Sequence, residues 1–242
     1  MEEQELHGGR TTPGVVRVGD TVRRPRGHRA PFVSTAVTWL NEHGFAHAPT
    51  YLGVDEQDRD VFEYVPGTTT DHPSQRQEAA YRNIASILRR LHTITSGADF
   101  LESGSSCLLH GDPGPYNVIM RDGRPVALID WDSARPGKPV EDVGYAGWTR
   151  CVQSVGNVPV HDQAQRLRAF RDAYDPALPG DELLTAVLDQ QARIAQIEAR
   201  VAADRSASTA RREHARGAVR WANNDAAFLR TNRDLFLTEL CL

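Results

Sequence analysis

Two short polar stretches, each at the end of an apolar run, constrain the fold of this chain more than any other feature. The first is Leu108–Asn117, with the sequence LLHGDPGPYN, and the second is Ile129–Asp132, with the sequence IDWD. Between them, two β-rich runs over 117–120 and 125–129 flank Asp122-Gly123, a dipeptide typical of two-residue hairpin turns. We therefore expect a hairpin that returns the second polar stretch to the same end of the structure as the first.

The side chains that this hairpin would bring together suit phosphoryl transfer. Asp112 and Asn117 bracket a tight, proline-containing loop, and Asp130 follows the second run of the hairpin. Phosphoryl transfer needs a carboxylate that orients and deprotonates the attacking hydroxyl, and oxygen ligands that hold Mg²⁺ on the triphosphate. Asp132 either joins such a metal site or caps the turn that follows it.

The spacing resembles the catalytic and metal-binding loops of the aminoglycoside phosphotransferase and choline kinase superfamily, relatives of the protein kinases. Their pattern is HGDxxxxN followed by IDW or IDF, and both halves are present. The resemblance implies an α+β, two-lobed, protein-kinase-like fold with the nucleotide between the lobes. It implies a β-rich nucleotide-binding lobe over residues 1–66 and a mainly helical lobe over residues 67–242, which holds both loops and the acceptor site.

Further segments extend the resemblance to about residues 8–148. Residues 62–67 (FEYVPG) are similar to the hinge of that superfamily, 88–92 to its helix before the catalytic loop, and 139–145 to the segment after its metal loop. Carried over by position, the resemblance makes Asp112 the catalytic base and makes Asn117 and Asp130 the Mg²⁺ ligands. It makes His110 and Asp142 structural supports of the catalytic loop, and it assigns the backbone of Glu63, Tyr64 and Val65 to the base of ATP or GTP.

The N-terminal part departs from the superfamily pattern at the lysine that contacts the phosphates. Lys138 is the only lysine in the chain, and the predicted helix over 32–40 carries no acid before Glu42. In position, Arg24 replaces the lysine. Arg23 and Arg24 point to opposite faces of a strand, so one of the two faces the nucleotide, and we expect it to be Arg24.

The remaining chain reads as a β-rich part followed by long helices. Residues 15–18 and 21–24 form a predicted hairpin preceded by a glycine-bearing turn over 8–14, a helix covers 32–40, and two strands cover 50–53 and 61–65. Apolar residues at helical spacing from Ala80 to Leu91 begin the helical part. The helices after residue 180 are expected to line the acceptor site. They contain no block of acids, so Asp204, Glu213 and Asp225 are interpreted as parts of solvated helix faces, with a place in the lining of the site as the alternative.

Composition excludes several classes of protein. With a net charge of -4 over 242 residues, the chain has no positive field that would attract nucleic acid or an anionic membrane. No apolar run is long enough to span a membrane, and the acidic start is unlike a signal peptide, so we expect a cytoplasmic protein. The three cysteines, Cys107, Cys151 and Cys241, are widely spaced and are expected to be reduced thiols. The oligomeric state cannot be read from this sequence.

The sequence therefore predicts a Mg²⁺-dependent kinase that phosphorylates a hydroxyl of an antibiotic-like or metabolite acceptor. Its main alternative is a catalytically weak or inactive binding or immunity protein on the same fold, which the missing lysine and helix acid favour. A phosphohydrolase that uses the same carboxylates is a more distant alternative, since it leaves the hinge and the N-terminal hairpin unexplained.

Overall fold

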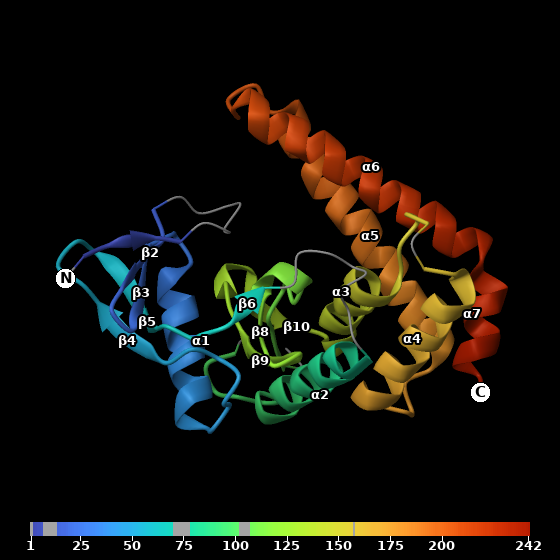
Figure 1. Cartoon of the computed structure of the whole chain (residues 1–242), viewed down its shortest axis with the longest axis horizontal. Coiled ribbons are helices and arrows are strands. Elements are labelled where there is room, and N and C mark those ends of the chain that lie inside the picture. Colours follow the sequence, from blue (N-terminus) through green and yellow to red (C-terminus); the bar gives the residue numbers. More distant parts are fainter. Residues whose placement is uncertain (1, 7–13, 70–77, 102–106, 157) are drawn as a thin grey trace. The chain divides into compact units, whose positions relative to one another are not determined.

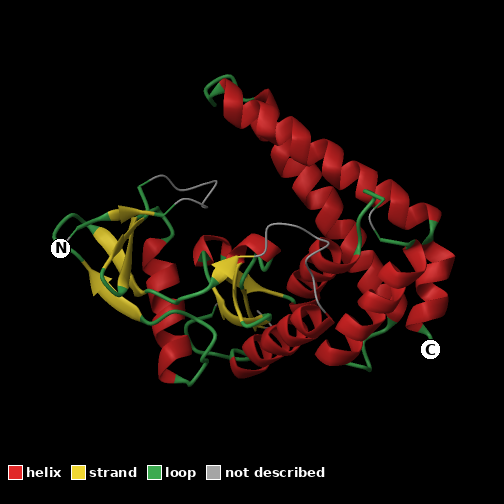
Figure 2. Ribbon diagram, in the orientation of Figure 1, coloured by secondary structure: helices red, strands yellow, loops and turns green. Residues whose placement is uncertain are grey.

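The computed structural model describes residues 2–6, 14–69, 78–101, 107–156 and 158–242. It contains two compact units, one formed by Met1–Thr70 with Arg90–Lys138 and the other by Asp71–Arg89 with Pro139–Leu242. All strands of the described residues belong to the first unit, whereas the second unit is helical (Figure 2). The chain is therefore of the predicted α+β class, with a β-sheet N-terminal region and a mainly helical C-terminal part.

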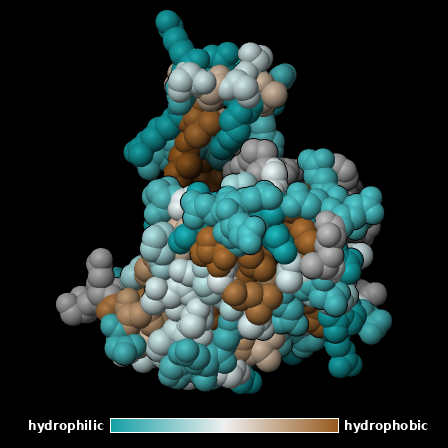
Figure 3. All heavy atoms as spheres, turned by 90° about the vertical axis from the view of Figure 1, so that its left-hand side faces the viewer, coloured by the Kyte–Doolittle hydropathy of each residue, from teal (hydrophilic) through white to brown (hydrophobic). Residues whose placement is uncertain are grey.

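An antiparallel sheet of five strands forms the N-terminal part of the first unit (Figure 1). Its order is β1-β2-β3-β5-β4, and its strands are β1 Gln4–Glu5, β2 Val16–Val18, β3 Thr21–Pro25, β4 Tyr51–Val54 and β5 Arg59–Glu63. The predicted hairpin is confirmed as β2 and β3, with Val18 paired to Thr21. Exposed apolar side chains occur on the edge strand β4, at Leu52 and Val54. Figure 3 shows the face of this sheet region, where hydrophobic side chains reach the surface among hydrophilic ones.

One helix, α1 (Ala30–Glu42), belongs to the same unit. A proline stands in its first turn, and its buried residues recur at helical spacing at positions 30, 33, 36, 37 and 40. Gly44 follows its end with a φ of 73°, as the predicted C-terminal cap requires. Contacts between α1 and the 3₁₀ turn η3 (Trp131–Ser133) connect this region to the predicted metal loop.

The predicted catalytic region, in the first unit, is built from short strands. The hairpin β8 (Val118–Arg121) and β9 (Arg124–Leu128) is confirmed, and β6 (Thr68–Thr69) adds a third strand beside β8. Asp122 and Gly123 both have positive φ, 51° and 73°, as a two-residue hairpin turn demands. Strand β7 (Cys107–Leu109) pairs with β10 (Arg135–Gly137), so the chain enters and leaves this region through one two-stranded ladder.

The helices are α2 Glu78–Ile94, which contributes to both units, and α3 Pro139–Cys151, α4 Val160–Tyr174, α5 Gly180–Ala203, α6 Thr209–Thr231 and α7 Arg233–Leu240 of the second unit. Helix α3 is buried along almost its whole length. A β-carbon on Gly144 would lie 2.7 Å from the backbone of Ala186, so glycine permits the close contact of α3 with α5. Helices α5 and α6 run side by side as a long antiparallel pair (Figure 1).

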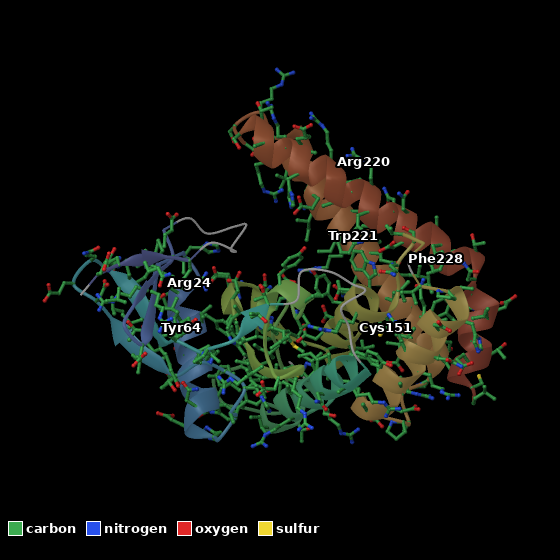
Figure 4. All side chains as sticks on the ribbon, viewed as in Figure 1. Arg24, Tyr64, Cys151, Arg220, Trp221 and Phe228 are labelled. Carbon is green, nitrogen blue, oxygen red and sulfur yellow. The ribbon has the colours of Figure 1, made fainter. Side chains whose placement is uncertain are left out.

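Asp225 corrects one prediction. Instead of lying on a solvated face of α6, it is fully buried, and its carboxylate accepts hydrogen bonds from Trp148 Nε1 at 2.8 Å and from the backbone N–H of Ser154 at 2.6 Å. Trp148 also stacks on Trp221, with ring centroids 4.2 Å apart. Figure 4 shows Trp221 on α6. Asp225 therefore joins α6 to α3 and to the loop after α3. Glu213 is exposed, and Asp204 caps a turn through Ser206.

Residues 8–13 of the predicted glycine turn lie outside the described residues, whereas Gly14 has a φ of 79°. The cysteines are free thiols, buried at 107 and 151 and exposed at 241. Among the helices of the described residues, none has the length and apolar character to cross a membrane. The lobe boundary at residue 66 stays a prediction.

Candidate active site

His110 connects two loops, residues 110–117 (the predicted catalytic loop, called the catalytic loop below) and residues 129–133 (the predicted metal loop, called the metal loop below). It follows β7, is fully buried, and places Nε2 3.1 Å from the carbonyl oxygen of Ile129. Its Nδ1 lies 3.4 Å from the backbone N–H of Asp112 and accepts this hydrogen bond. Nδ1 is then unprotonated, so Nε2 carries the hydrogen and donates to Ile129. One side chain thus sets the position of the residue before Asp130 and the backbone of Asp112.

Asn117 makes a second connection between the same two loops. Its side-chain Nδ2 donates to the backbone oxygen of Asp112 at 3.0 Å, and its own carbonyl oxygen accepts from the N–H of Ile129 at 2.9 Å. Because the amide nitrogen is used inside the loop, the side-chain oxygen is the atom of Asn117 that suits an outside ligand.

Asp130 has a backbone conformation that few residues adopt. Its φ of 61° and ψ of 64° are left-handed, a region that aspartate tolerates better than most side chains. The next residue, Trp131, is buried and donates from Nε1 to the carbonyl oxygen of Leu128 at 3.0 Å. Such a conformation persists where surrounding contacts hold it, and it is common at functional sites.

Arg24 of β3 brings a positive charge to the metal loop. Its Nη2 lies 3.2 Å from Asp130 Oδ1 and 2.5 Å from Asp132 Oδ2. The Arg24 side chain is only 13% exposed, while those of Asp130 and Asp132 are 36% and 52% exposed. Figure 4 shows Arg24 in the sheet part of the chain. The guanidinium therefore bridges both carboxylates of the loop.

Arg23, the neighbouring residue, makes different contacts. Its register partner on β5 is Val61, whereas that of Arg24 is Asp60, so the two arginines point to opposite faces of the sheet. Arg23 Nη1 lies 3.3 Å from Asp55 Oδ2, in a network that also contains Arg59 and Glu3. Within the described residues, the hydrogen bond and ion pair of Arg23 are made with Asp55 and not with the metal loop.

Asp132 does not cap the turn that follows it, since its carboxylate pairs with Arg24. Partial burial raises the pKa of Asp132 above its ordinary value. The guanidinium of Arg24 opposes this shift, whereas the nearby carboxylate of Asp130 adds to it. Two carboxylates and one guanidinium thus form a single charged cluster.

The predicted hinge uses two of its backbone donors inside the first unit. The N–H of Glu63 donates to the carbonyl oxygen of Thr50 at 2.9 Å. The N–H of Tyr64 donates to the backbone carbonyl oxygen of Asp20 at 2.8 Å. The Tyr64 ring lies 3.7 Å from the guanidinium carbon of Arg17. Of the three hinge residues, Val65 alone has a backbone N–H for which the described part of the chain supplies no acceptor. Val65 therefore keeps a backbone donor, and the contact of this hinge with a nucleotide base stays a prediction.

The sites predicted from sequence fall into two groups. The first unit contains most of them, namely Arg24, Glu63, Tyr64, Val65, His110, Asp112, Asn117 and Asp130. Asp142 lies buried in the first turn of α3, in the second unit, and its support of His110 stays a prediction. Sequence reasoning missed Gly111, whose backbone packs directly against that of Ser133 and so joins the two loops, although its place beside Asp112 in the motif was a usable signal. It also left the partner of Asp132 unidentified.

The donor set fits Mg²⁺ bound together with a nucleotide. Among the described residues, no group of three or more His, Cys, Asp or Glu side chains is arranged to hold a metal ion. Mg²⁺ does not need such a group, because it is commonly bound by one or two carboxylates together with substrate phosphates and water. Asp130 and the side-chain oxygen of Asn117 are hard oxygen donors on adjoining loops, so they would hold it.

Comparisons of sequence agree with this geometry. Residues 98–180, which contain both loops, match the model of the phosphotransferase enzyme family. The trifolitoxin immunity protein of Rhizobium leguminosarum bv. trifolii is 32% identical over 189 residues, covering 69% of this chain and 71% of that protein.

Comparisons of structure extend the likeness to the whole fold. A choline kinase from Cryptosporidium parvum Iowa II is similar with a TM-score of 0.67 at 9% identity, over 100% of this chain and 93% of that one. An aminoglycoside phosphotransferase bound to ADP is similar with a TM-score of 0.60 at 13% identity, over 93% of each chain. At these identities the likeness establishes the fold, which is the two-lobed kinase-like fold expected from the motifs.

Proposed function

Because the chain belongs to the phosphotransferase enzyme family, we propose that it is a small-molecule kinase that moves the γ-phosphoryl group of ATP or GTP to a hydroxyl. The observation that carries the proposal is the joining of the catalytic loop to the metal loop. The side chains of His110 and Asn117 each form a hydrogen bond with the backbone of Asp112. His110 also bonds to the carbonyl oxygen of Ile129, and the backbone oxygen of Asn117 accepts from the N–H of Ile129. A base and a metal ligand are thus held in one rigid arrangement, as positioning catalysis requires.

Asp112 is the proposed base. It is half-buried, lies in the loop before η2 (Pro115–Asn117), and its backbone is held on both sides by His110 and Asn117. Its carboxylate orients the acceptor hydroxyl and takes its proton as the phosphoryl group is transferred. The transfer is direct and in line, so no covalent enzyme intermediate is needed.

Charge neutralisation is assigned to the other residues of the site. Asp130 and Asn117 would hold Mg²⁺, which supplies neutralisation of the phosphate charge that develops during transfer. Arg24 orients the phosphates in place of the usual lysine, since a guanidinium can bind two phosphate oxygens at once. Val65 offers a backbone N–H to the base of the nucleotide. The ADP bound by the aminoglycoside phosphotransferase relative supports a nucleotide as the donor.

The acceptor is proposed to be neutral or only modestly cationic. A polycation would need several carboxylates that converge on it, to offset its loss of hydration. Of the three acids considered in the C-terminal helices, Asp225 is buried and bonded to Trp148, and Asp204 is bonded to Ser206. Glu213 is exposed on a helix face, and Asp204 is exposed at the end of α5. Other exposed acids of the described helices, such as Asp181 and Asp189, are scattered along the sequence and form no block that would suit an aminoglycoside with many amino groups.

A second function has one specific observation in its favour, which is the similarity to an immunity protein. In that alternative the chain protects by binding a toxic compound, and phosphorylation is weak or absent. Asp112, Asn117 and Asp130 are all retained, and a protein that only binds has no chemical need for this set. The kinase proposal is preferred for that reason.

The proposal is tested by incubating the protein with MgATP or MgGTP and a panel of acceptors. The panel contains aminoglycosides, macrolides, amino alcohols, nucleosides, sugars and hydroxyl-bearing peptides, and mass spectrometry scores any product heavier by one phosphoryl group. We expect such a product with at least one neutral or modestly cationic acceptor. Tight binding of a panel compound without any phosphorylated product, under conditions where MgATP also binds, would favour the immunity alternative.

A further inference from the structure

Arg24 and the proposed metal ion would compete for the same carboxylate. Replacement of the lysine of the superfamily does not by itself account for this competition. The guanidinium lies 3.2 Å from Asp130 Oδ1, on the carboxylate that is the proposed metal ligand. It is also paired with Asp132, and its side chain is only 13% exposed. A divalent cation that uses Asp130 must therefore share this carboxylate with the guanidinium or displace it.

Sharing is unfavourable when the cation arrives alone. Arginine keeps its charge under all ordinary conditions, so proton loss cannot relieve the repulsion. The Arg24 side chain is only 13% exposed while that of Asp130 is 36% exposed, so water screens two positive groups at this carboxylate only in part. These three side chains together carry a net charge of -1, because two carboxylates face one guanidinium, so the guanidinium halves the negative charge that would attract a dication.

A nucleoside triphosphate changes this balance. Its phosphates offer the guanidinium new oxygen acceptors in the paired geometry that arginine prefers. Once Arg24 turns to them, the oxygens of Asp130 are available to a metal ion, and the negative phosphates also offset the added positive charge. Each ligand thus removes the obstacle to the other.

We propose that Arg24 couples metal binding to nucleotide binding by acting as an internal cation on Asp130 and Asp132. The free protein then binds a divalent metal weakly, and the metal and the triphosphate bind as one complex. Coupling of this kind is reciprocal, so Arg24 favours the metal–nucleotide complex over either ligand alone. The inference rests on the proposed function, because it assigns the metal to Asp130 and the phosphates to Arg24.

Arg23 provides a matched control. It has the same side chain on the same strand, but it points to the other face of the sheet and pairs with Asp55. Removing its charge changes the net charge of the protein by the same amount as removing that of Arg24. Any difference between the two variants therefore reports the local contact with the metal loop and not the overall field.

The test measures binding of Mn²⁺ alone, from the loss of the electron paramagnetic resonance signal of free Mn²⁺, with no nucleotide present. We expect Arg24→Met to bind Mn²⁺ at least about 5-fold more tightly than the wild type, the lower end of typical coupling between sites. Arg23→Met should bind Mn²⁺ as the wild type does. Arg24→Lys, which keeps a positive charge, should stay within about 2-fold of the wild type. Circular dichroism checks that each variant is folded.

A second measurement separates this inference from the proposed function. Binding of a fluorescent ATP analogue is measured for the wild type with Mg²⁺ and with EDTA. If the wild type binds the analogue only with Mg²⁺, yet Arg24→Met gains no affinity for Mn²⁺, the coupling role of Arg24 is wrong and the kinase proposal stands. An equal gain in Arg23→Met or in Arg24→Lys also overturns the coupling role. If the wild type binds no nucleotide under either condition, the proposed function itself fails.

Discussion

Gly111 and Ser133 lie backbone against backbone, so closely that a β-carbon on Gly111 would be 2.1 Å from the carbonyl oxygen of Ser133. Gly111 precedes Asp112 and Ser133 follows Asp132, so this contact joins the catalytic loop to the metal loop. Gly111 also has a φ of 83°, which side-chain-bearing residues seldom adopt. Glycine is needed at this position for two separate reasons.

Gly111→Ala should therefore cost more stability than left-handed backbone strain alone. Gly97→Ala is the matched control, because Gly97 has a φ of 73° but an added β-carbon would meet nothing within 4 Å. The control should lose about 1 to 2 kcal/mol, and Gly111→Ala should lose clearly more, with nucleotide binding impaired. Urea denaturation measures both. Equal losses in the two variants would mean that the contact with Ser133 relaxes easily.

The metal assignment predicts unequal effects at the two proposed ligands. Asp130→Asn keeps the shape of the side chain and tolerates the left-handed backbone, but it removes the charge that a hard dication prefers. We expect it to weaken Mg²⁺-dependent nucleotide binding more than Asn117→Ala does. Calorimetry with and without Mg²⁺ measures the difference. Wild-type affinity for MgATP in Asp130→Asn would remove Asp130 from the metal site.

Asp225 should be one of the most sensitive positions for stability. Asp225→Ala leaves the indole N–H of Trp148 and the backbone N–H of Ser154 without their acceptor. Two hydrogen bonds to a buried charged group are worth about 1.5 to 3 kcal/mol each, so we expect a loss of about 3 to 6 kcal/mol. Glu213→Ala, at an exposed position of the same helix, should change stability by less than about 0.5 kcal/mol. Urea denaturation compares them, and similar small losses would contradict a bonded Asp225.

A pH effect is expected from Asp55, which links Arg23 and Arg59 on the outer face of the sheet. Burial acts to raise the pKa of Asp55. Hydrogen bonds from Arg59 and Gln57 outweigh this effect and hold the pKa below its ordinary value of 3.8. A carboxyl whose pKa is lowered by folding contributes stability above its unfolded pKa, and this contribution is lost as the pH falls through its folded pKa.

Asp55→Asn should accordingly lower Tm at neutral pH, and the difference from the wild type should shrink as the pH falls below about 4. Asp58→Asn is the control, because the Asp58 side chain is 82% exposed. Its Tm should stay near that of the wild type throughout. Thermal unfolding across this pH range tests both statements. A pH-independent difference for Asp55→Asn would show that its charge is not the cause.

The sequence predicted the parts of the molecule that local patterns determine. The β8–β9 hairpin follows from Asp122-Gly123 between two apolar runs, and α1 follows from apolar residues at helical spacing before Gly44. Both features depend on neighbours within a few turns of chain, which a single sequence displays. The two-lobed kinase-like fold was expected only from the resemblance of the two motifs to a known superfamily.

Contacts between distant residues could not be predicted in the same way. Arg24 and Asp132 are separated by 108 positions, and nothing in either segment indicates that they pair. The short strands β6, β7 and β10 have two or three residues each, too few for a periodic pattern, and their partners are far along the chain. Asp225 reads as a surface acid because its partners, Trp148 and Ser154, lie on other elements.

The most direct test of the central claim is transfer of the γ-phosphoryl group from radiolabelled ATP to the acceptor found in the panel, by the wild type and by Asp112→Asn. We predict that the variant folds, binds MgATP as the wild type does, and transfers at least about 10²-fold more slowly. Asparagine preserves the loop but cannot accept the proton. Transfer at the wild-type rate by Asp112→Asn would contradict the assignment of the base and, with it, the account of this site as the catalytic centre of a kinase.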